Sequence, residues 1–189
     1  MEKSDLRRKI KAMRLMLSDD DKSGAAEQVF SQLEKCAAFL LADKILMYHS
    51  LPDELSTIAF LDKWGTKKHF YLPRVNGVNL DILPYDRSRL ELGAFHIEEP
   101  VGDELTDPAE IELIVVPAVA YDRRGNRLGL YGDCLGRGKG FYDRLLSTTK
   151  ATKIGVGYDF QLVDEIDVEP HDIPMDMVIT QTEVLLISK

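Results

Sequence analysis

Apolar residues near the start of the chain recur three or four positions apart, the spacing of one helical face, and predict a helix over residues 5–17. The stripe consists of Leu6, Ile10, Met13 and Leu17. Ser18, followed three positions later by Asp21, resembles a capping box and predicts a second helix that runs towards Leu40. We expect these two helices to form an N-terminal helical hairpin.

Short apolar runs then predict buried strands over residues 44–49, 69–72, 80–83, 112–116, 153–158 and 184–187. A short helix is expected at residues 57–64 and another from about Gly140 onwards. The run 112–116 ends at Pro117, as expected in the middle of a mostly parallel sheet. Strands that alternate with helices predict the α/β class, as a three-layer α/β/α arrangement around a mostly parallel open sheet. No repeat or linker-like stretch interrupts the chain, so we expect a single domain over residues 1–189.

Composition is that of an ordinary globular protein, with 44% hydrophobic residues in 189. No apolar run approaches the length of about 20 residues that a membrane helix needs, and charged residues occupy the N-terminus where a signal peptide would be apolar. We therefore expect a cytoplasmic protein with no membrane partner. Cys36 and Cys134 lack the spacing of a zinc site or a redox pair, so we interpret both as free thiols.

Charge is distributed unevenly along the chain. The net charge is −8, yet residues 1–14 and residues 123–144 each contain six basic residues and two acidic ones. Two cationic segments on an acidic protein favour a small polyanion as the ligand. They argue against nucleic acid, for which a broad basic face is expected.

The segment 137–144, Arg-Gly-Lys-Gly-Phe-Tyr-Asp-Arg, combines the residue types of a phosphate and metal site. Gly138 and Gly140 allow backbone N–H groups to approach an anion, and Arg137 and Lys139 add positive charge. Asp143 offers the oxygen ligand that Mg²⁺ prefers. The alternative is a basic surface turn that begins an amphipathic helix.

The expected fold places this segment beside other loops. Ligands of open α/β sheets usually bind beyond the carboxyl ends of the strands. Residues 49–54 follow the first predicted strand and residues 118–140 follow the central one, so both loops are expected at one edge. Asp172 and Asp176 precede the last predicted strand, and only the fold decides whether they approach Asp143.

Ordered motifs over nearly the whole chain resemble the 5-formyltetrahydrofolate cyclo-ligase family. They are Lys3-x-x-Leu6-Arg7, residues 48–54 (Tyr-His-Ser-Leu-Pro-Asp-Glu), Leu72-Pro73-Arg74, Glu99-Pro100, Val116-Pro117 with Tyr121-Asp122, Arg127-Leu128-Gly129 with residues 137–144, and Pro170-His171-Asp172 with Asp176. The resemblance implies an ATP- and Mg²⁺-dependent enzyme that converts 5-formyltetrahydrofolate to 5,10-methenyltetrahydrofolate, with ADP and phosphate as products. It also implies a scaffold like the NagB/RpiA/CoA-transferase-like fold.

The implied chemistry accounts for the residue types. A formamide oxygen is a poor leaving group, so the resemblance implies that it is phosphorylated to an iminophosphate, which N10 attacks before phosphate departs. The protein then has to position two substrates and neutralise charge on the transferred phosphoryl group.

The resemblance also assigns roles to individual residues. The ATP-binding residues are Lys3, Arg7, Arg137, Gly138, Lys139, Gly140, Phe141 and Tyr142, of which Lys139 and Arg137 are the catalytic pair. The substrate-binding residues are His49, Glu54 and Tyr142, and the metal ligands are Asp143 and Asp176. Each has a structural alternative, such as solvated charges for the N-terminal basic residues, a helix-starting acid for Glu54 and a strand-end acid for Asp176.

The chain departs from the family pattern in one segment. Residues 130–136 intervene between Arg127-Leu128-Gly129 and Arg137, so either Arg127 or Arg137 keeps the first phosphate position. Phe141 also lacks a hydroxyl where a tyrosine is common.

Two other functions remain open, a non-catalytic folate or nucleotide binder and a sugar-phosphate enzyme on the same scaffold. A monomer is expected.

Overall fold

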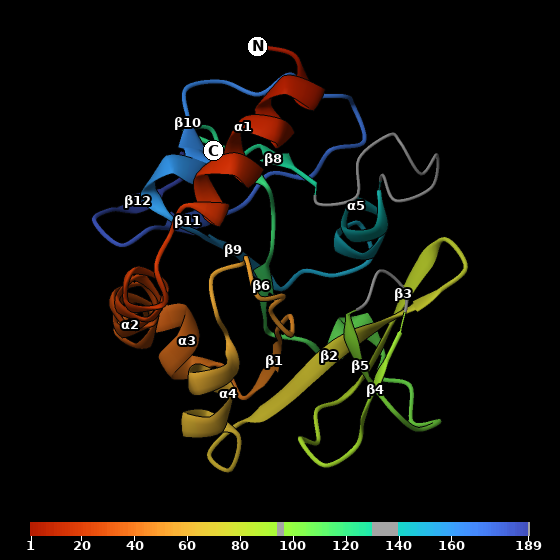
Figure 1. Ribbon diagram of the computed structural model, residues 1–189. Coiled ribbons are helices and arrows are strands. Elements are labelled where there is room, and N and C mark those ends of the chain that lie inside the picture. The colour runs from red at the N-terminus through yellow and green to blue at the C-terminus, as the bar shows by residue number, and fades with distance from the viewer. Residues whose placement is uncertain (94–96, 130–139, 189) are drawn as a thin grey trace.

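A seven-stranded sheet with the order β12-β11-β9-β6-β1-β2-β3 forms the centre of the computed structural model, which describes residues 1–93, 97–129 and 140–188 (Figure 1). Its parallel strands are β1 (Lys44–Leu46), β2 (His69–Asn76), β6 (Leu113–Val116), β9 (Thr152–Val156) and β11 (Met177–Ile179). The edge strands β3 (Asn79–Pro84) and β12 (Val184–Leu186) run antiparallel to their neighbours. The α/β class and the mostly parallel sheet are therefore confirmed.

Helices cover both faces of this sheet. α2 (Asp19–Glu34), α3 (Ala37–Leu41) and α4 (Ile58–Trp64) pack on one face, and α5 (Phe141–Leu146) packs on the other. Each face has its own hydrophobic core, the first under α2, α3 and α4 and the second under α5. Because successive side chains of a strand point to opposite faces, Ile45 of β1 belongs to the first core and Leu46 to the second. The structure thus has the predicted three layers.

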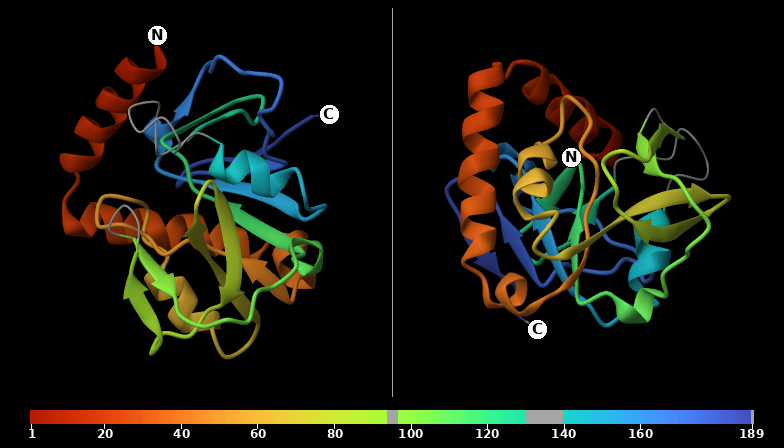
Figure 2. Two further views of the ribbon diagram at one scale, coloured as in Figure 1. Left: turned by 90° about the vertical axis from the view of Figure 1, so that its right-hand side faces the viewer. Right: turned by 90° about the horizontal axis from the view of Figure 1, so that it is seen from below.

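The N-terminal helices begin near the predicted positions but do not pack as a hairpin, and the second ends at Glu34 and is followed by α3 instead of continuing to Leu40. Ser18 and Asp21 make the capping box at the start of α2. α1 (Lys3–Leu15) and α2 leave their connection in different directions (Figure 2). The apolar side of α1 packs in a third core together with Val119, Ala120, Leu128 and Ile166, whereas α2 packs on the large sheet. The hairpin prediction was wrong because the two apolar stripes have different partners.

Several short elements escaped prediction because they are too short for a periodic pattern. A second sheet of β10 (Leu162–Val163), β7 (Ala120–Asp122) and β8 (Arg127–Leu128) lies beneath α1, and β4 (Leu90–Leu92) pairs with β5 (Glu98–Pro100). Two 3₁₀ turns span Pro108–Glu110 and Asp159–Gln161. Among the described residues, no helix is long and apolar enough to cross a membrane.

Pro73 lies within β2, although its strand was expected to end before the proline. The His69 N–H donates to Asp43 O on the β1 side, and the alternation of a strand places the Pro73 nitrogen on that side as well. The register of β1 with β2 ends at Leu46 opposite Tyr71, so the missing N–H falls where the ladder has ended.

Candidate functional site

A small cavity lies at the carboxyl ends of three neighbouring parallel strands. The residues that line it are Tyr48 after β1, Pro117 and Ala118 after β6, Val156 at the end of β9, Gln161, Arg14 of α1, and Glu54 and Leu55 of the loop after β1. This is the sheet edge at which open α/β proteins usually bind ligands. The loop after β1 and the loop after β6 meet there, as the sequence predicts.

The loop after β1 is held in shape by its own hydrogen bonds. The Tyr48 hydroxyl donates to Leu55 O at 2.9 Å, and Thr57 Oγ1 donates to Tyr48 O at 2.7 Å. The Leu51 N–H donates to the Glu54 carboxylate at 2.8 Å. These contacts fix Glu54, which is only 7% exposed, at the cavity wall.

Burial raises the pKa of Glu54 to about 7. The hydrogen bond from Leu51 and the positive charge of Arg14 lower this pKa, and the charge of Asp53 raises it, but loss of solvent dominates. Near neutral pH the carboxyl group is therefore present in both protonation states. It can accept a hydrogen bond from a ligand in either state and can donate one when protonated.

Buried tyrosines surround Glu54. Burial raises the pKa of Tyr48, Tyr121 and Tyr142 well above the ordinary value, and the charge of Glu54 adds to each effect, which places all three near its carboxylate. Burial also raises the pKa of Tyr158 to about 12, and its hydroxyl donates to Glu54 O at 3.4 Å. These tyrosines therefore stay neutral at physiological pH, and Tyr48 is the one that lines the cavity.

The start of α5 forms the neighbouring part of the edge. Gly140 is the N-cap residue and has φ 91°, a left-handed conformation that favours glycine. Asp143 lies in the first turn of α5, where its Oδ1 accepts the Ile173 N–H at 3.1 Å. Phe141 and Tyr142 of α5 are buried.

Arg127 connects this helix to the end of β6. One terminal nitrogen lies 3.7 Å from Asp143 Oδ2, the other donates to Pro117 O at 3.4 Å, and the guanidinium lies 5.4 Å from the ring centroid of Tyr142. Its side chain is 6% exposed, and its Nε has no hydrogen-bond partner among the residues that the structure describes. Arg127 and Arg137 are the two arginines expected for the first phosphate position. Arg127 lies at the carboxyl edge of the sheet, and Arg137 is outside the described residues.

The first cationic segment reaches the second through α1. Arg7 Nε donates to Gly129 O at 3.3 Å, immediately before the segment that leads to Gly140. Lys3 lies one turn earlier on the same helix and is half-buried. The remaining predicted phosphate residues, Arg137, Gly138 and Lys139, lie outside the described residues, as do residues 130–136 and Cys134.

The structure groups Asp143 with other possible metal ligands than Asp176. Ligand atoms of Asp143, His171 and Asp172 all lie within 4.8 Å of one another. Asp176 is not part of this group. It precedes β11, and its Oδ2 accepts the Lys153 N–H at 2.8 Å near the start of β9. The amino ends of these strands are the opposite edge of the sheet from the cavity, and the metal role of Asp176 stays a prediction.

His49 is half-buried on the loop after β1. Burial lowers the pKa of its imidazole, and the charge of Glu98 opposes this effect, so the side chain lies near β5 as well as near the cavity loop.

Arg14 lines the cavity, although the sequence motifs assign it no role. Its signal was its spacing, since it follows Leu6 and Ile10 at intervals of four on the buried side of α1.

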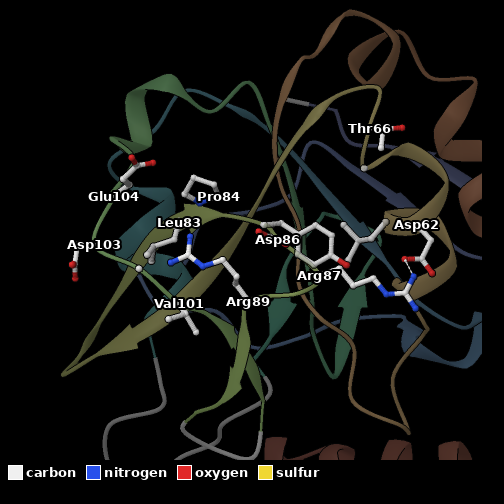
Figure 3. A pocket seen from close by; sticks show the side chains of 14 residues that line it. Asp62, Thr66, Leu83, Pro84, Asp86, Arg87, Arg89, Val101, Asp103 and Glu104 are labelled. Atoms are coloured by element: carbon white, nitrogen blue, oxygen red, sulfur yellow. Dashed lines mark hydrogen bonds and ion pairs between the residues drawn. The ribbon is translucent and has the colours of Figure 1, made fainter.

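A larger depression of about 800 Å³ lies elsewhere (Figure 3). It is lined by the end of α4, the end of β3 and residues 101–104, towards the amino ends of β1 and β2. Arg87 and Asp62 pair with each other there at 3.2 Å. No residue predicted to bind ATP, folate or metal lines it, so its size does not make it the site.

The fold and the cavity define an α/β protein with a candidate ligand site at the carboxyl ends of its central strands. The chain belongs to the 5-formyltetrahydrofolate cyclo-ligase family, because that family's model matches residues 1–181. The family resemblance found in the motifs is thereby confirmed.

Individual relatives agree with this assignment. The 5-formyltetrahydrofolate cyclo-ligase of Escherichia coli is 29% identical over 185 residues, which cover 93% of this chain and 98% of the relative. A solved structure of 5,10-methenyltetrahydrofolate synthetase from Aquifex aeolicus is 33% identical, with a TM-score of 0.86 over 100% of this chain and 94% of the other. A synthetase from Mycoplasma pneumoniae has a TM-score of 0.73 at 23% identity over 96% of this chain and 99% of the other, which shows the shared fold.

Proposed function

We propose that this protein converts 5-formyltetrahydrofolate to 5,10-methenyltetrahydrofolate while ATP is converted to ADP and phosphate. Family membership supports the reaction, and the Aquifex relative of known structure is a methenyltetrahydrofolate synthetase. The observation that carries the proposal is the position of α1, whose Arg7 contacts Gly129 while its Arg14 lines the Glu54 cavity. One helix thus joins the expected ATP side and the expected folate side.

The proposed reaction has two steps. The formyl oxygen attacks the γ-phosphorus of ATP, so that an O–P bond forms and the bond to ADP breaks. N10 then attacks the activated formyl carbon and loses its proton, and phosphate leaves with the former formyl oxygen and takes up a proton. The protein contributes by holding both substrates and by stabilising charge on the phosphoryl group.

The proposed roles follow the sequence motifs. The folate site consists of His49, Glu54 and Tyr142. The ATP site consists of Lys3, Arg7, Arg137, Gly138, Lys139, Gly140, Phe141 and Tyr142. Lys139 and Arg137 would act on the transferred phosphoryl group. Arg127, which is buried beside Tyr142, would be a second arginine at the ATP site.

For Mg²⁺ we propose Asp143 and Asp172 in place of the pair with Asp176. Two carboxylates within reach of each other fit a metal that prefers oxygen ligands and completes its shell with phosphate oxygens and water. When bound, Mg²⁺ would neutralise negative charge on the phosphates. Asp143 Oδ1 is already oriented by the Ile173 N–H, which favours a fixed ligand.

The proposal also covers the domain count, the oligomeric state, the location and the partners of the protein. We infer that residues 1–189 act as a single domain and as a monomer in the cytoplasm, without a nucleic-acid or membrane partner. The free Cys36 thiol supports the cytoplasmic location, and the net charge of −8 supports the absence of a nucleic-acid partner. The likeness to the NagB/RpiA/CoA-transferase-like fold stays a prediction.

The deciding experiment combines purified protein with 5-formyltetrahydrofolate, ATP and Mg²⁺ and follows the near-ultraviolet absorbance of the methenyl product. We expect the absorbance to rise together with ADP, and neither to appear when ATP is left out. Bound folate without product would instead favour a non-catalytic binder. Turnover of a sugar phosphate, with no folate binding, would favour the third function.

A further inference from the structure

Arg14 is a buried charge at a position where the apolar stripe of α1 continues. The buried residues of this helix are Leu6, Ile10 and Arg14, and the Arg14 side chain is only 8% exposed. A guanidinium is always charged and carries several N–H donors, so burying it is costly unless those donors are paired. The chain therefore keeps a cation where leucine or methionine would pack.

The partners of Arg14 within the described ranges do not satisfy it. A terminal nitrogen lies 3.7 Å from Asp53 Oδ2, which is beyond the length of a hydrogen bond. Its Nε is buried and has no hydrogen-bond partner among the described residues. Because nearly all buried polar atoms in proteins are paired, an unpaired donor here indicates a ligand.

The surroundings of Arg14 show where that ligand would lie. Arg14 lines the same cavity as Glu54, at the carboxyl ends of β1, β6 and β9. Gln161 also lines it, but its Nε2 already donates to Ala118 O and Val119 O at 3.1 and 3.0 Å. The cavity thus offers a guanidinium as donor and a carboxyl group as acceptor.

We propose that Arg14 is a substrate-binding residue that donates a hydrogen bond to an acceptor atom on the pterin head of 5-formyltetrahydrofolate. The inference rests on the proposed function and adds a residue to its folate site. A reduced pterin carries N–H donors and a ring carbonyl along one edge, which match Glu54 and Arg14. The cavity is only about 10 Å³, so that edge would contact the two side chains from outside and would not be enclosed. The negatively charged glutamate tail suits this cavity less well, because Glu54 and Asp53 lie there.

The test measures binding by isothermal titration calorimetry for wild type, Arg14→Lys and Arg14→Met. The ligands are 5-formyltetrahydrofolate and 5-formyltetrahydropterin, which lacks the tail. We expect both variants to bind both ligands about 10- to 100-fold more weakly, the usual effect of losing a hydrogen bond from a charged donor. Arg8→Lys is the matched control on the same helix, where the side chain is 78% exposed, and should bind like wild type.

Stability separates a binding role from a structural one. Methionine can fill the apolar stripe of α1 and removes the cost of burying a guanidinium whose Nε is unpaired among the described residues. The Asp53 carboxylate that Arg14→Met leaves behind is 30% exposed and stays solvated. We therefore expect the unliganded Arg14→Met protein to have a free energy of unfolding at least equal to that of wild type, measured by urea denaturation. A marked loss of stability in this variant, with wild-type affinity in Arg14→Lys, would show that Arg14 is structural.

Three other results would overturn the inference. Unchanged affinity in both variants would exclude the contact. A loss restricted to the ligand with the tail would assign Arg14 to the tail carboxylates. If wild type binds neither ligand, the proposed function fails as well, and this outcome is distinguished by the wild-type titration alone.

Discussion

At the scale of single residues, the site depends on buried ionisable groups whose charge the fold controls. Glu54 is the clearest, because burial raises its pKa to about 7 from an ordinary 4.5. Below about pH 4.5 the carboxyl group is protonated in both the folded and the unfolded protein. Between pH 4.5 and 7 the folded protein keeps a proton that the unfolded chain releases, so stability falls as pH rises.

We predict that Glu54→Gln abolishes this part of the pH dependence. Relative to the variant, wild type should lose about 3 kcal/mol of free energy of unfolding between pH 4.5 and pH 8.5, the equivalent of its pKa difference. Urea denaturation of both proteins across that range measures it. Glu27→Gln, at an exposed position of α2, is the control and should follow wild type. Parallel curves for wild type and Glu54→Gln would contradict the raised pKa.

The second prediction at this scale concerns the metal. Asp143→Asn and Asp172→Asn should each raise the Mg²⁺ concentration that gives half-maximal turnover, by about tenfold or more, because each removes a charged ligand. Asp176→Asn should leave the metal titration unchanged and lower stability instead, since that carboxylate accepts the Lys153 N–H. Shifted titrations in Asp143→Asn and Asp176→Asn, with an unchanged titration in Asp172→Asn, would restore the original pair.

At the scale of elements, the small sheet supports the site through one close contact. Tyr121 of β7 lies against β9, where a side chain at Gly155 would overlap the Tyr121 ring. The Tyr121 hydroxyl donates to Val116 O and, at 3.2 Å, to Val156 O, which are the ends of β6 and β9. Gly155 is therefore a packing requirement for the strands that carry the cavity.

We predict that Gly155→Ala destabilises the protein by about 1 to 3 kcal/mol, the usual cost of overpacking a core. The matched control is Gly24→Ala in α2, where an added Cβ meets no atom within 4 Å and should slightly stabilise the helix. Thermal denaturation of the two variants measures the contrast. Equal effects of both substitutions would show that the Tyr121 contact is unimportant.

At the scale of the whole molecule, local pattern predicted what is local. The apolar runs placed β1, β6 and β9, and Ser18 with Asp21 placed the start of α2. The prediction that α1 packs against α2 as a hairpin was wrong, because the residues on which α1 packs, such as Val119 and Ile166, are more than a hundred positions away in sequence.

The site was predicted in part for the same reason. Glu54, Asp143 and Arg7 were singled out by motif. Glu54 lines the cavity, Arg127 links Asp143 to Pro117 at the same edge, and Arg7 contacts Gly129. Arg14 and the choice between Asp172 and Asp176 depended on distances across the sheet. Four positions separate those two aspartates in sequence, yet one faces Asp143 and the other pairs with β9.

The last prediction tests whether the two substrates are handled by separable parts of the molecule. Lys139 is expected to act on the transferred phosphoryl group, whereas folate is held by Glu54 and its neighbours. Lys139→Ala should therefore lower kcat by about 10²- to 10³-fold, as for other preorganised charges at a reacting centre. Its Kd for 5-formyltetrahydrofolate should stay close to that of wild type.

Steady-state kinetics and calorimetry on the same preparation measure both quantities. Lys11→Ala removes an equal charge from an exposed position of α1 and should change neither. Equal losses of turnover and folate affinity in Lys139→Ala would mean that its charge acts on ground-state binding, and the assignment to phosphoryl transfer would then fail.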